Sequence, residues 1–376
     1  AVLPFAASSL FGCNAAQDQP ESGEISEETP LKLNILLLGG TSFLGPHQIA
    51  YAMERGHSIT TFTRGRTQPT VHKELFDNIT QLTGDRANDL TALENGSWDV
   101  VIDNSGHNVD WARDSARLLK DRCDLYMFTS STGVYYPYLD DQINEDHEVL
   151  LVEPDEIQDE EMKLEYWYGV MKSNSEIAVK EEFGDDRTLI IRPTYMIGPA
   201  DKSNRFIHWP VRLSRGGDVL VPGLPADPIQ YADVRDVAEF MIRMVEKKMA
   251  GTYNAAGPET KQGMLDFVTE AHRPFDNEVS LISVDDYEFL KKEGILYIVP
   301  WIMPEGNNYG SARIDNSTGI AAGLTFRRLE DTVRDTYEWW YSDALTAEQR
   351  DEFEMNPESV LVREDEILER WKKYRS

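Results

Sequence analysis

Tyr168 and Lys172 are the side chains in this sequence best spaced to move a proton. Their interval of four residues places a phenol and an ammonium on one face of a helix. A free tyrosine has a pKa of about 10, and a lysine one turn away, together with the positive end of a nicotinamide ring, would favour the phenolate. A phenol whose pKa lies nearer to working pH is a competent general acid or base. The pair therefore predicts proton transfer to or from a hydroxyl group.

Ser131 is the third candidate for the same chemistry. It lies in a run of hydroxyl and small residues directly after an apolar stretch that predicts a strand at residues 125–129. A serine hydroxyl can hydrogen-bond a substrate oxygen as that oxygen changes between hydroxyl and carbonyl. For the three residues to meet, residues 162–183 must form a helix beside this strand end, where ligands of α/β proteins bind. Thr132 then becomes a substrate-contact candidate.

A glycine-rich turn supplies the place for a cofactor. Residues 35–38 are apolar enough for one buried strand, and a helical pattern follows at residues 46–55. Strand, glycine turn and helix together place a pyrophosphate on the helix N-terminus. The usual middle glycine is a serine here, so the fingerprint is incomplete. The cofactor-binding residues predicted for the turn are Gly39, Gly40, Thr41, Ser42, Phe43, Leu44 and Gly45.

The end of the second predicted strand, residues 58–62, leaves the choice of dinucleotide open. An acid there would bind the ribose 2′-hydroxyl and favour NAD, but this chain has Thr63 followed by Arg64 and Arg66. Arginines can instead pair with a 2′-phosphate, so NADP is chemically possible, and solvated loop arginines are the alternative. With either dinucleotide, Lys172 can also hold the nicotinamide ribose hydroxyls.

Two further strand ends carry polar candidates. Asp85 follows the third predicted strand, residues 79–82, where a carboxylate can accept a hydrogen bond from the adenine amino group. Ser105 lies in a small-residue loop after the fourth strand, residues 98–102, which lets a ribose approach the backbone. His107 in the same loop is a catalytic candidate, although loop histidines are more often simply exposed.

The order of predicted elements indicates the fold class. Residues 33–135 alternate strand and helix with short connections, which is typical of a parallel sheet covered on both faces. We expect an α/β protein, a Rossmann-type doubly wound parallel sheet with a smaller C-terminal α/β substrate-binding region. The predicted parts are 1–31, a signal remnant and flexible tether; 32–200, the dinucleotide-binding domain, its sheet completed by parts of 225–260; 201–345, the substrate-binding region; and 346–376, a charged helical tail.

Composition restricts the class of partner. With 376 residues, 41% of them hydrophobic, the chain can bury a large core. Its 66 acidic and 37 basic residues give a net charge of -29, which repels nucleic acid and anionic lipid. Two cysteines cannot form a disulfide framework or a metal cluster by themselves, so no metal site is expected. The expected partner is a small molecule.

The residues before Cys13 resemble a targeting signal. It follows Leu10, Phe11 and Gly12 in a small-residue, apolar stretch that resembles the end of a bacterial lipoprotein signal, and residues 14–30 read as a polar tether. The pattern predicts an exported protein, lipid-anchored at Cys13 in a bacterial cell envelope. A flexible N-terminus of a cytoplasmic protein is the alternative.

Together these features resemble the extended short-chain dehydrogenase/reductase superfamily, in its NAD-dependent epimerase/dehydratase family. The resemblance covers residues 33 to 340. Its carriers are residues 39–45, Gly84 with Asp85, residues 130–135, residues 168–172 and residues 191–199. It implies that Ser131 and Tyr168 form the hydroxyl pair with Lys172 in support, and that Pro193 lies against the nicotinamide.

Departures from the family pattern narrow the substrate. Sugar-nucleotide 4,6-dehydratases have an Asp and a Glu after the catalytic Thr, and here Thr132 and Gly133 stand in those places. UDP-galactose epimerases have an arginine shortly before an Asp-Val-x-Asp stretch, where residues 229–232 contain none. A sugar nucleotide is therefore less favoured. The chain looks closest to a bacterial branch with a G-G-T-x-F-L-G opening. Chloroplast RNA-binding relatives share that opening, but the net charge argues against RNA here.

The C-terminal part is expected to supply the substrate side. Arg205, His208 and Trp209 could contact a sugar ring, with an interdomain core position as the alternative for Trp209. Residues 348–374 are charged and helical, and are expected to pack on the domain or on another subunit. Dimers are common in the superfamily, so a homodimer is one expectation.

The sequence leads to three functional hypotheses. The first is an NAD(P)-dependent epimerase-like oxidoreductase that acts on a hydroxyl of a sugar or polyol. Export favours redox-neutral chemistry, by epimerisation or by oxidation, elimination and reduction, because a cofactor carried out within the folded protein must be regenerated in each cycle. The second is a net NAD(P)H-dependent carbonyl reductase. The third is a non-enzymatic dinucleotide-binding sensor, which the presence of Ser131, Tyr168 and Lys172 disfavours.

Overall fold

A parallel sheet of seven strands lies at the centre of the computed structural model, which describes residues 32–376. Its strands are β1 (Asn34–Leu38), β2 (Ser58–Thr63), β3 (Thr80–Thr83), β4 (Val100–Asp103), β5 (Leu125–Thr129), β6 (Thr188–Pro193) and β10 (Gly251–Ala255). The strand order is β3–β2–β1–β4–β5–β6–β10, so a strand from residues 225–260 completes the sheet as predicted. Cys13 and the expected tether lie outside the described residues, and the lipid anchor stays a prediction.

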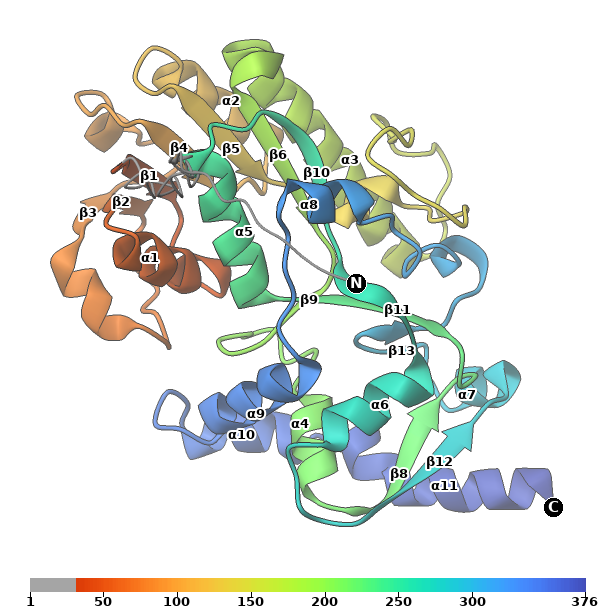
Figure 1. Cartoon of the computed structure of the whole chain (residues 1–376). Helices are drawn as coiled ribbons and strands as arrows, with labels where there is room; N and C mark the ends of the chain where they lie inside the picture. Colours follow the sequence, from red (N-terminus) through yellow and green to blue (C-terminus); the bar gives the residue numbers. More distant parts are fainter. Residues whose placement is uncertain (1–31) are drawn as a thin grey trace, which may run out of the picture. The chain divides into compact units, whose positions relative to one another are not determined.

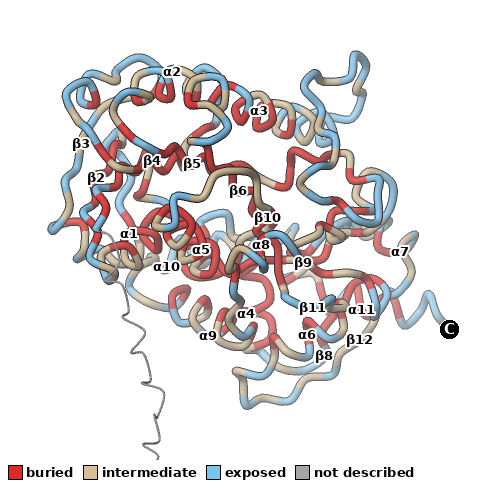
Figure 2. Tube along the Cα trace, turned by 45° about the horizontal axis from the view of Figure 1, so that its top comes forward, coloured by how far each residue is buried: buried red, intermediate tan, exposed pale blue. Residues whose placement is uncertain are grey.

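Alternate side chains of each strand face opposite sides of the sheet. On β1, Ile35 and Leu37 pack toward α1 (Leu44–Glu54) and α5 (Val234–Glu246). Leu36 and Leu38 pack toward α2 (Val109–Leu119) and α3 (Glu160–Phe183) on the other face (Figure 1). Because both faces are covered, the central strands β1, β4, β5 and β6 are mostly apolar and buried, as Figure 2 shows for β4, β5 and β6. The doubly wound Rossmann-type fold is confirmed.

The carboxyl ends of the strands meet at one edge. Leu38 at the end of β1 pairs with Asp103 at the end of β4, and Asp103 pairs with Phe128 of β5. Thr129 in turn pairs with Ile191 of β6. The order of strands reverses between β1 and β4, which is where ligands bind in open α/β sheets.

The C-terminal region has a hydrophobic core of its own, which we call the second core. Its elements are α4 (His208–Ser214), β8 (Gly217–Pro222), α6 (Met264–His272), β12 (Val279–Val284), α7 (Tyr287–Lys292) and α9 (Leu329–Trp340). Strands β8 and β12 pair in parallel, and helices cover them. The linking pieces are β7 (Met196–Ile197), β9 (Pro228–Asp233), β11 (Gly257–Gly263), β13 (Tyr297–Ile298), β14 (Trp301–Ile302) and α8 (Ser317–Ala322).

The charged tail is helical, as expected, and it is interrupted by a short segment that contains Pro357. Two helices form, α10 (Ala347–Glu354) and α11 (Val360–Arg375). Proline offers no amide to continue a helix, and the Ser359 side chain caps the new start. Ile367 and Trp371 of α11 join the second core, so the tail packs on the domain. Within residues 32–376, no helix is long and apolar enough to cross a membrane.

Candidate active site

The glycine turn after β1 has the backbone geometry of a pyrophosphate site. Gly39 and Gly40 have φ values of +97° and +117°, which L side chains rarely adopt. A Cβ on Gly45 would lie 2.3 Å from the Cα of Gly40, so only glycine lets α1 begin this close to the turn. No side chain caps the start of α1 at Phe43, and its first turn holds no acidic residue. The free, positive N-terminus of α1 therefore fits an anion.

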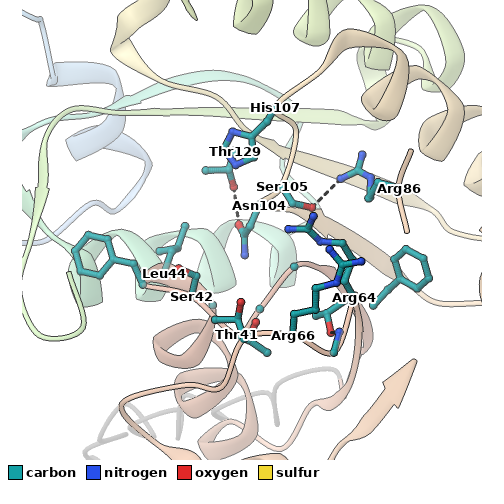
Figure 3. Close-up of a pocket in the computed structure, with 18 of the residues that line it drawn as sticks. Thr41, Ser42, Leu44, Arg64, Arg66, Arg86, Asn104, Ser105, His107 and Thr129 are labelled. Atoms are coloured by element: carbon teal, nitrogen blue, oxygen red, sulfur yellow. Dashed lines mark hydrogen bonds between the residues drawn. The ribbon is translucent and has the colours of Figure 1, made fainter. Parts of the chain in front are cut away.

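A cavity of about 370 Å³ runs from this turn along the carboxyl ends of β2, β3 and β4 (Figure 3). Every residue predicted for the turn lines it, as do Arg64, Asp85 and Ser105. Two residues predicted to bind the cofactor do not line this cavity: Pro193 lines the one beside it, and Lys172, which is buried, lines neither. The turn and these three side chains are thus brought together as the sequence predicts.

Arg86 is a cavity residue that the sequence reasoning missed. Its guanidinium donates to both carboxylate oxygens of buried Asp103, at 2.5 and 2.8 Å, and at 2.9 Å to the Ser105 hydroxyl (Figure 3). Tyr126 donates to the same carboxylate at 2.7 Å. Although burial opposes ionisation, the Arg86 guanidinium holds the pKa of Asp103 below its usual value. Its position directly after Gly84 and Asp85 could have indicated that Arg86 lines the cavity. Its pairing with Asp103 could not be predicted in this way, because Asp103 lies on another strand.

Ser131 and Tyr168 are brought side by side by two glycines. Ser131 precedes a short 3-10 helix (Thr132–Tyr135), and its hydroxyl accepts from the Gly133 amide at 3.0 Å. A Cβ on Gly169 of α3 would lie 2.6 Å from the Gly133 carbonyl oxygen, and a Cβ on Gly133 would lie 2.9 Å from the Tyr168 ring. Helix α3 therefore approaches the end of β5 closely only because both positions lack side chains.

Lys172 lies one turn below Tyr168 on α3. Its ammonium donates to the Thr129 carbonyl at 3.0 Å and lies 6.0 Å from the centre of the Tyr168 ring. Burial lowers the pKa of Lys172 to about 8, against the opposing effect of the carboxylates of Asp103 and Glu176. The ammonium is thus positioned at the end of β5 by its bond to Thr129.

The surroundings of the Tyr168 phenol oppose the phenolate in the protein without a bound cofactor. Burial raises the pKa of Tyr168 and outweighs the lowering by the Ser131 hydroxyl and by Arg205; Glu165 raises it further. The phenolate expected from the sequence requires the positive charge of Lys172 together with that of a bound nicotinamide ring. Burial disfavours the charged form of an acid, so a phenolate here needs further positive charge.

A second cavity, of about 400 Å³, opens beside the catalytic candidates. Thr132 and Arg205 line it as predicted, together with Ser131 and Tyr168. Pro193, which the resemblance assigned to the cofactor, lines this second cavity as well. Met196 lines both cavities, so the two adjoin.

Several substrate-side residues were missed. Glu165, Trp167, Tyr138 and Tyr195 also line the second cavity. Glu165 lies three residues before Tyr168 on the same face of α3, a spacing the sequence offered. Burial and Glu161 raise its pKa, while Arg205 lowers it.

His208 and Trp209 do not reach this cavity, which corrects their assignment as substrate contacts. Trp209 is fully buried in the second core and donates to the Val299 carbonyl at 3.0 Å, so the core alternative holds. His208 is also buried, and burial lowers its pKa to about 3. The first turn of α4 faces inward. His107, by contrast, lines the cofactor cavity, not the cavity beside Tyr168.

A network of buried hydrogen bonds lies next to Ser131 and links α3 to the sheet. Glu176 of α3 accepts from the Ser130 hydroxyl and from Nε and Nη2 of Arg192, at 3.0 and 2.7 Å. Arg192 also donates to the Tyr135 hydroxyl at 2.8 Å, and that hydroxyl donates to Asn254. The network joins the ends of β5, β6 and β10 to α3, which holds Ser131 and Tyr168 in register.

Known proteins share both the sequence pattern and the fold. The model of the NAD dependent epimerase/dehydratase family matches residues 35–256. The chain is 25% identical over 280 residues to the chloroplast stem-loop binding protein of 41 kDa b of Arabidopsis thaliana, covering 69% of this chain and 68% of that protein.

Two solved structures illustrate the likeness of fold. The enzyme WbmH of Bordetella bronchiseptica, in complex with NAD+, is 17% identical, with a TM-score of 0.59 over 84% of this chain and 100% of that chain. UDP-glucuronic acid 4-epimerase of Bacillus cereus, in complex with NAD, is 16% identical, with a TM-score of 0.57 over 84% and 99%.

Proposed function

Because the chain belongs to the NAD dependent epimerase/dehydratase family, we propose that it is an epimerase-like oxidoreductase that binds a nicotinamide dinucleotide beside residues 39–45. Its substrate would be a sugar or polyol, oxidised at a hydroxyl. The observation that supports the proposal is that Ser131 and Tyr168 line the second cavity, while Lys172 donates to the carbonyl of Thr129, which lines the first. A dinucleotide in the first cavity and a small hydroxylated molecule in the second would then meet beside these residues.

The chain's own residues supply the proton chemistry. A bound nicotinamide would provide one function, the acceptance and return of a hydride. Tyr168 takes the proton of the substrate hydroxyl while the hydrogen on the same carbon leaves as hydride. Tyr168 returns that proton in the reverse step. Ser131 donates a hydrogen bond to the oxygen while it is a carbonyl. Lys172 holds ribose hydroxyls and adds positive charge beside a phenol whose pKa burial has raised.

We propose that the hydride returns to the same substrate, so the net reaction is redox-neutral. The expected anchor at Cys13 supports this, because an exported protein meets no pool of reduced cofactor. Net NAD(P)H-dependent carbonyl reduction is the alternative for a cytoplasmic protein. A dinucleotide-binding sensor is the second alternative.

The lining of the second cavity supports a carbohydrate-like substrate. Tyr138, Tyr195 and Trp167 offer aromatic faces to the apolar side of a sugar ring, and Glu165 and Arg205 offer partners for its hydroxyls. The Arg205 guanidinium already lies 5.4 Å from the centre of the Tyr195 ring. Mixed aromatic and polar walls of this kind suit a molecule with many hydroxyls.

The test is a search for hydride transfer by the cofactor-loaded protein. It would be incubated with a panel of sugars, polyols and sugar nucleotides, while absorbance at 340 nm and proton NMR spectra report reduced cofactor and new epimers. A substrate is expected to give one of these signals with the parent protein and none with Tyr168→Phe, which should bind cofactor equally well. Turnover that survives Tyr168→Phe contradicts the assigned role. Cofactor binding without turnover of any compound favours the sensor.

A further inference from the structure

We propose that the cofactor cavity recognises a phosphate on the 2′ position of the adenosine ribose, so that the protein prefers NADP to NAD. This inference rests on the proposed function, which requires a dinucleotide in the cavity. It goes further by assigning the discriminating residues, Arg64 and Arg66, and the chemical group they bind.

The wall after β2 contains no carboxylate. Residues 63–67 line the cavity without interruption, and none of them is acidic. Thr63 occupies the strand end, and its hydroxyl accepts from the Gly65 amide at 3.1 Å, which fixes the turn. In NAD-binding folds of this kind, a carboxylate at the end of the second strand accepts from the ribose 2′-hydroxyl and repels a phosphate. No side chain of this wall carries a negative charge that would repel a phosphate.

Arg64 and Arg66 follow at the same strand end. Both are exposed and line the cavity, and Figure 3 shows them next to Thr41 of the glycine turn. Neither donates a side-chain hydrogen bond or forms an ion pair within residues 32–376. Every other arginine in that part of the chain does one or the other, including Arg122 and Arg205, which bond without an ion pair. Two free guanidiniums in one cavity stand out in a chain with 66 acidic and 37 basic residues.

The charges facing the cavity favour an additional anion. Arg64 and Arg66 add two positive charges, whereas the charge of Arg86 is matched by its bidentate pairing with Asp103. Asp85 is the acid that lines the cavity, and one of its oxygens accepts from the Ala87 amide at 3.0 Å. A phosphate monoester carries about −1.5 to −2 charges at neutral pH. The planar guanidinium fork binds such oxygens better than any other side chain.

The experiment compares cofactors that differ only in the 2′ group. Calorimetry on the full chain, freed of co-purified nucleotide with charcoal, would measure the Kd of NAD, NADP, 5′-ADP and 2′,5′-ADP. NADP is expected to bind about 10- to 100-fold more tightly than NAD, and 2′,5′-ADP more tightly than 5′-ADP by a similar factor. The preference should shrink at high salt, because exposed charges are screened.

Variants assign the effect to the two arginines. The double substitution Arg64→Gln with Arg66→Gln should weaken NADP binding to the level of NAD while leaving the Kd of NAD within about threefold. Thr63→Asp should reverse the preference. Arg328→Gln, at an exposed arginine outside the cavity, is the matched control and should change neither Kd.

Each outcome decides one of the two proposals. NAD bound as tightly as NADP, or more tightly, overturns the assignment of a 2′-phosphate and leaves the dinucleotide site standing. Loss of NADP and NAD binding in equal measure in the arginine variant also overturns it. If the parent chain binds none of the four probes, the proposed function fails as well.

Discussion

Gly45→Ala should separate the start of α1 from the glycine turn. A Cβ at this position would lie 2.3 Å from the Gly40 Cα and 2.5 Å from its carbonyl carbon and oxygen. Carbon atoms pack at about 3.5–4.0 Å, so the two segments must move apart by roughly 1.2 Å. A hydrogen bond stretched by that distance is lost. Two amide bonds to a phosphate, each worth about 1.5–3 kcal/mol, correspond to a Kd raised about 10²- to 10⁴-fold.

Calorimetry with NAD and NADP measures this effect, and thermal unfolding measures the accompanying loss of stability. The free energy of unfolding should fall by about 1–3 kcal/mol, as for other overpacked sites. Ala50→Gly on the same helix is the control, because it costs about 1 kcal/mol of stability and leaves the turn intact. If Gly45→Ala binds both dinucleotides within threefold of the parent, the turn is not the pyrophosphate site.

Four further predictions follow from the site and its support. Burial lowers the pKa of Lys172 to about 8, so the ammonium is charged below pH 7 and loses its charge as the pH rises through 8. The affinity for the dinucleotide should therefore fall about tenfold by pH 9.5. The affinity for 2′,5′-ADP, which lacks the nicotinamide ribose, should show no such decline. Gly169→Ala should slow hydride transfer about 100-fold by displacing the phenol, with little change in the melting temperature because alanine gains about 1 kcal/mol of helix propensity. Glu176→Ala leaves Arg192 buried without its carboxylate and should cost about 3–5 kcal/mol in urea unfolding; a loss below 1 kcal/mol contradicts the network. Trp371→Ala leaves a cavity in the second core and should lower the free energy of unfolding by about 3–5 kcal/mol. An unchanged free energy of unfolding would contradict the packing of α11 on this core.

The fold and the cofactor turn could be predicted from the sequence because their signals are local. The apolar strand before Gly39, the glycine at position 45 and the hydroxyl residues after Thr129 lie within short windows whose geometry the residue types dictate. The sheet edge then brings them together without further information. Asp85 was found for the same reason.

The remaining features depend on contacts between distant segments. Arg86 acquires its role from Asp103, on another strand, and Glu165 from the cavity that α3 helps to form. Trp209 was misassigned because nothing in the sequence near it shows which face of α4 is buried. The raised pKa of Tyr168 was not predicted, because burial of the phenol is a property of the folded chain.

The most direct test of the central claim is to identify the nucleotide that the chain binds. The purified protein would be denatured with acid or heat and the released nucleotide identified by mass spectrometry, after which the emptied, refolded chain would be titrated with NAD and NADP. The account predicts that a nicotinamide dinucleotide is released or that one of the two binds when added. An absence of released nucleotide together with no binding of either would contradict the site built on residues 39–45.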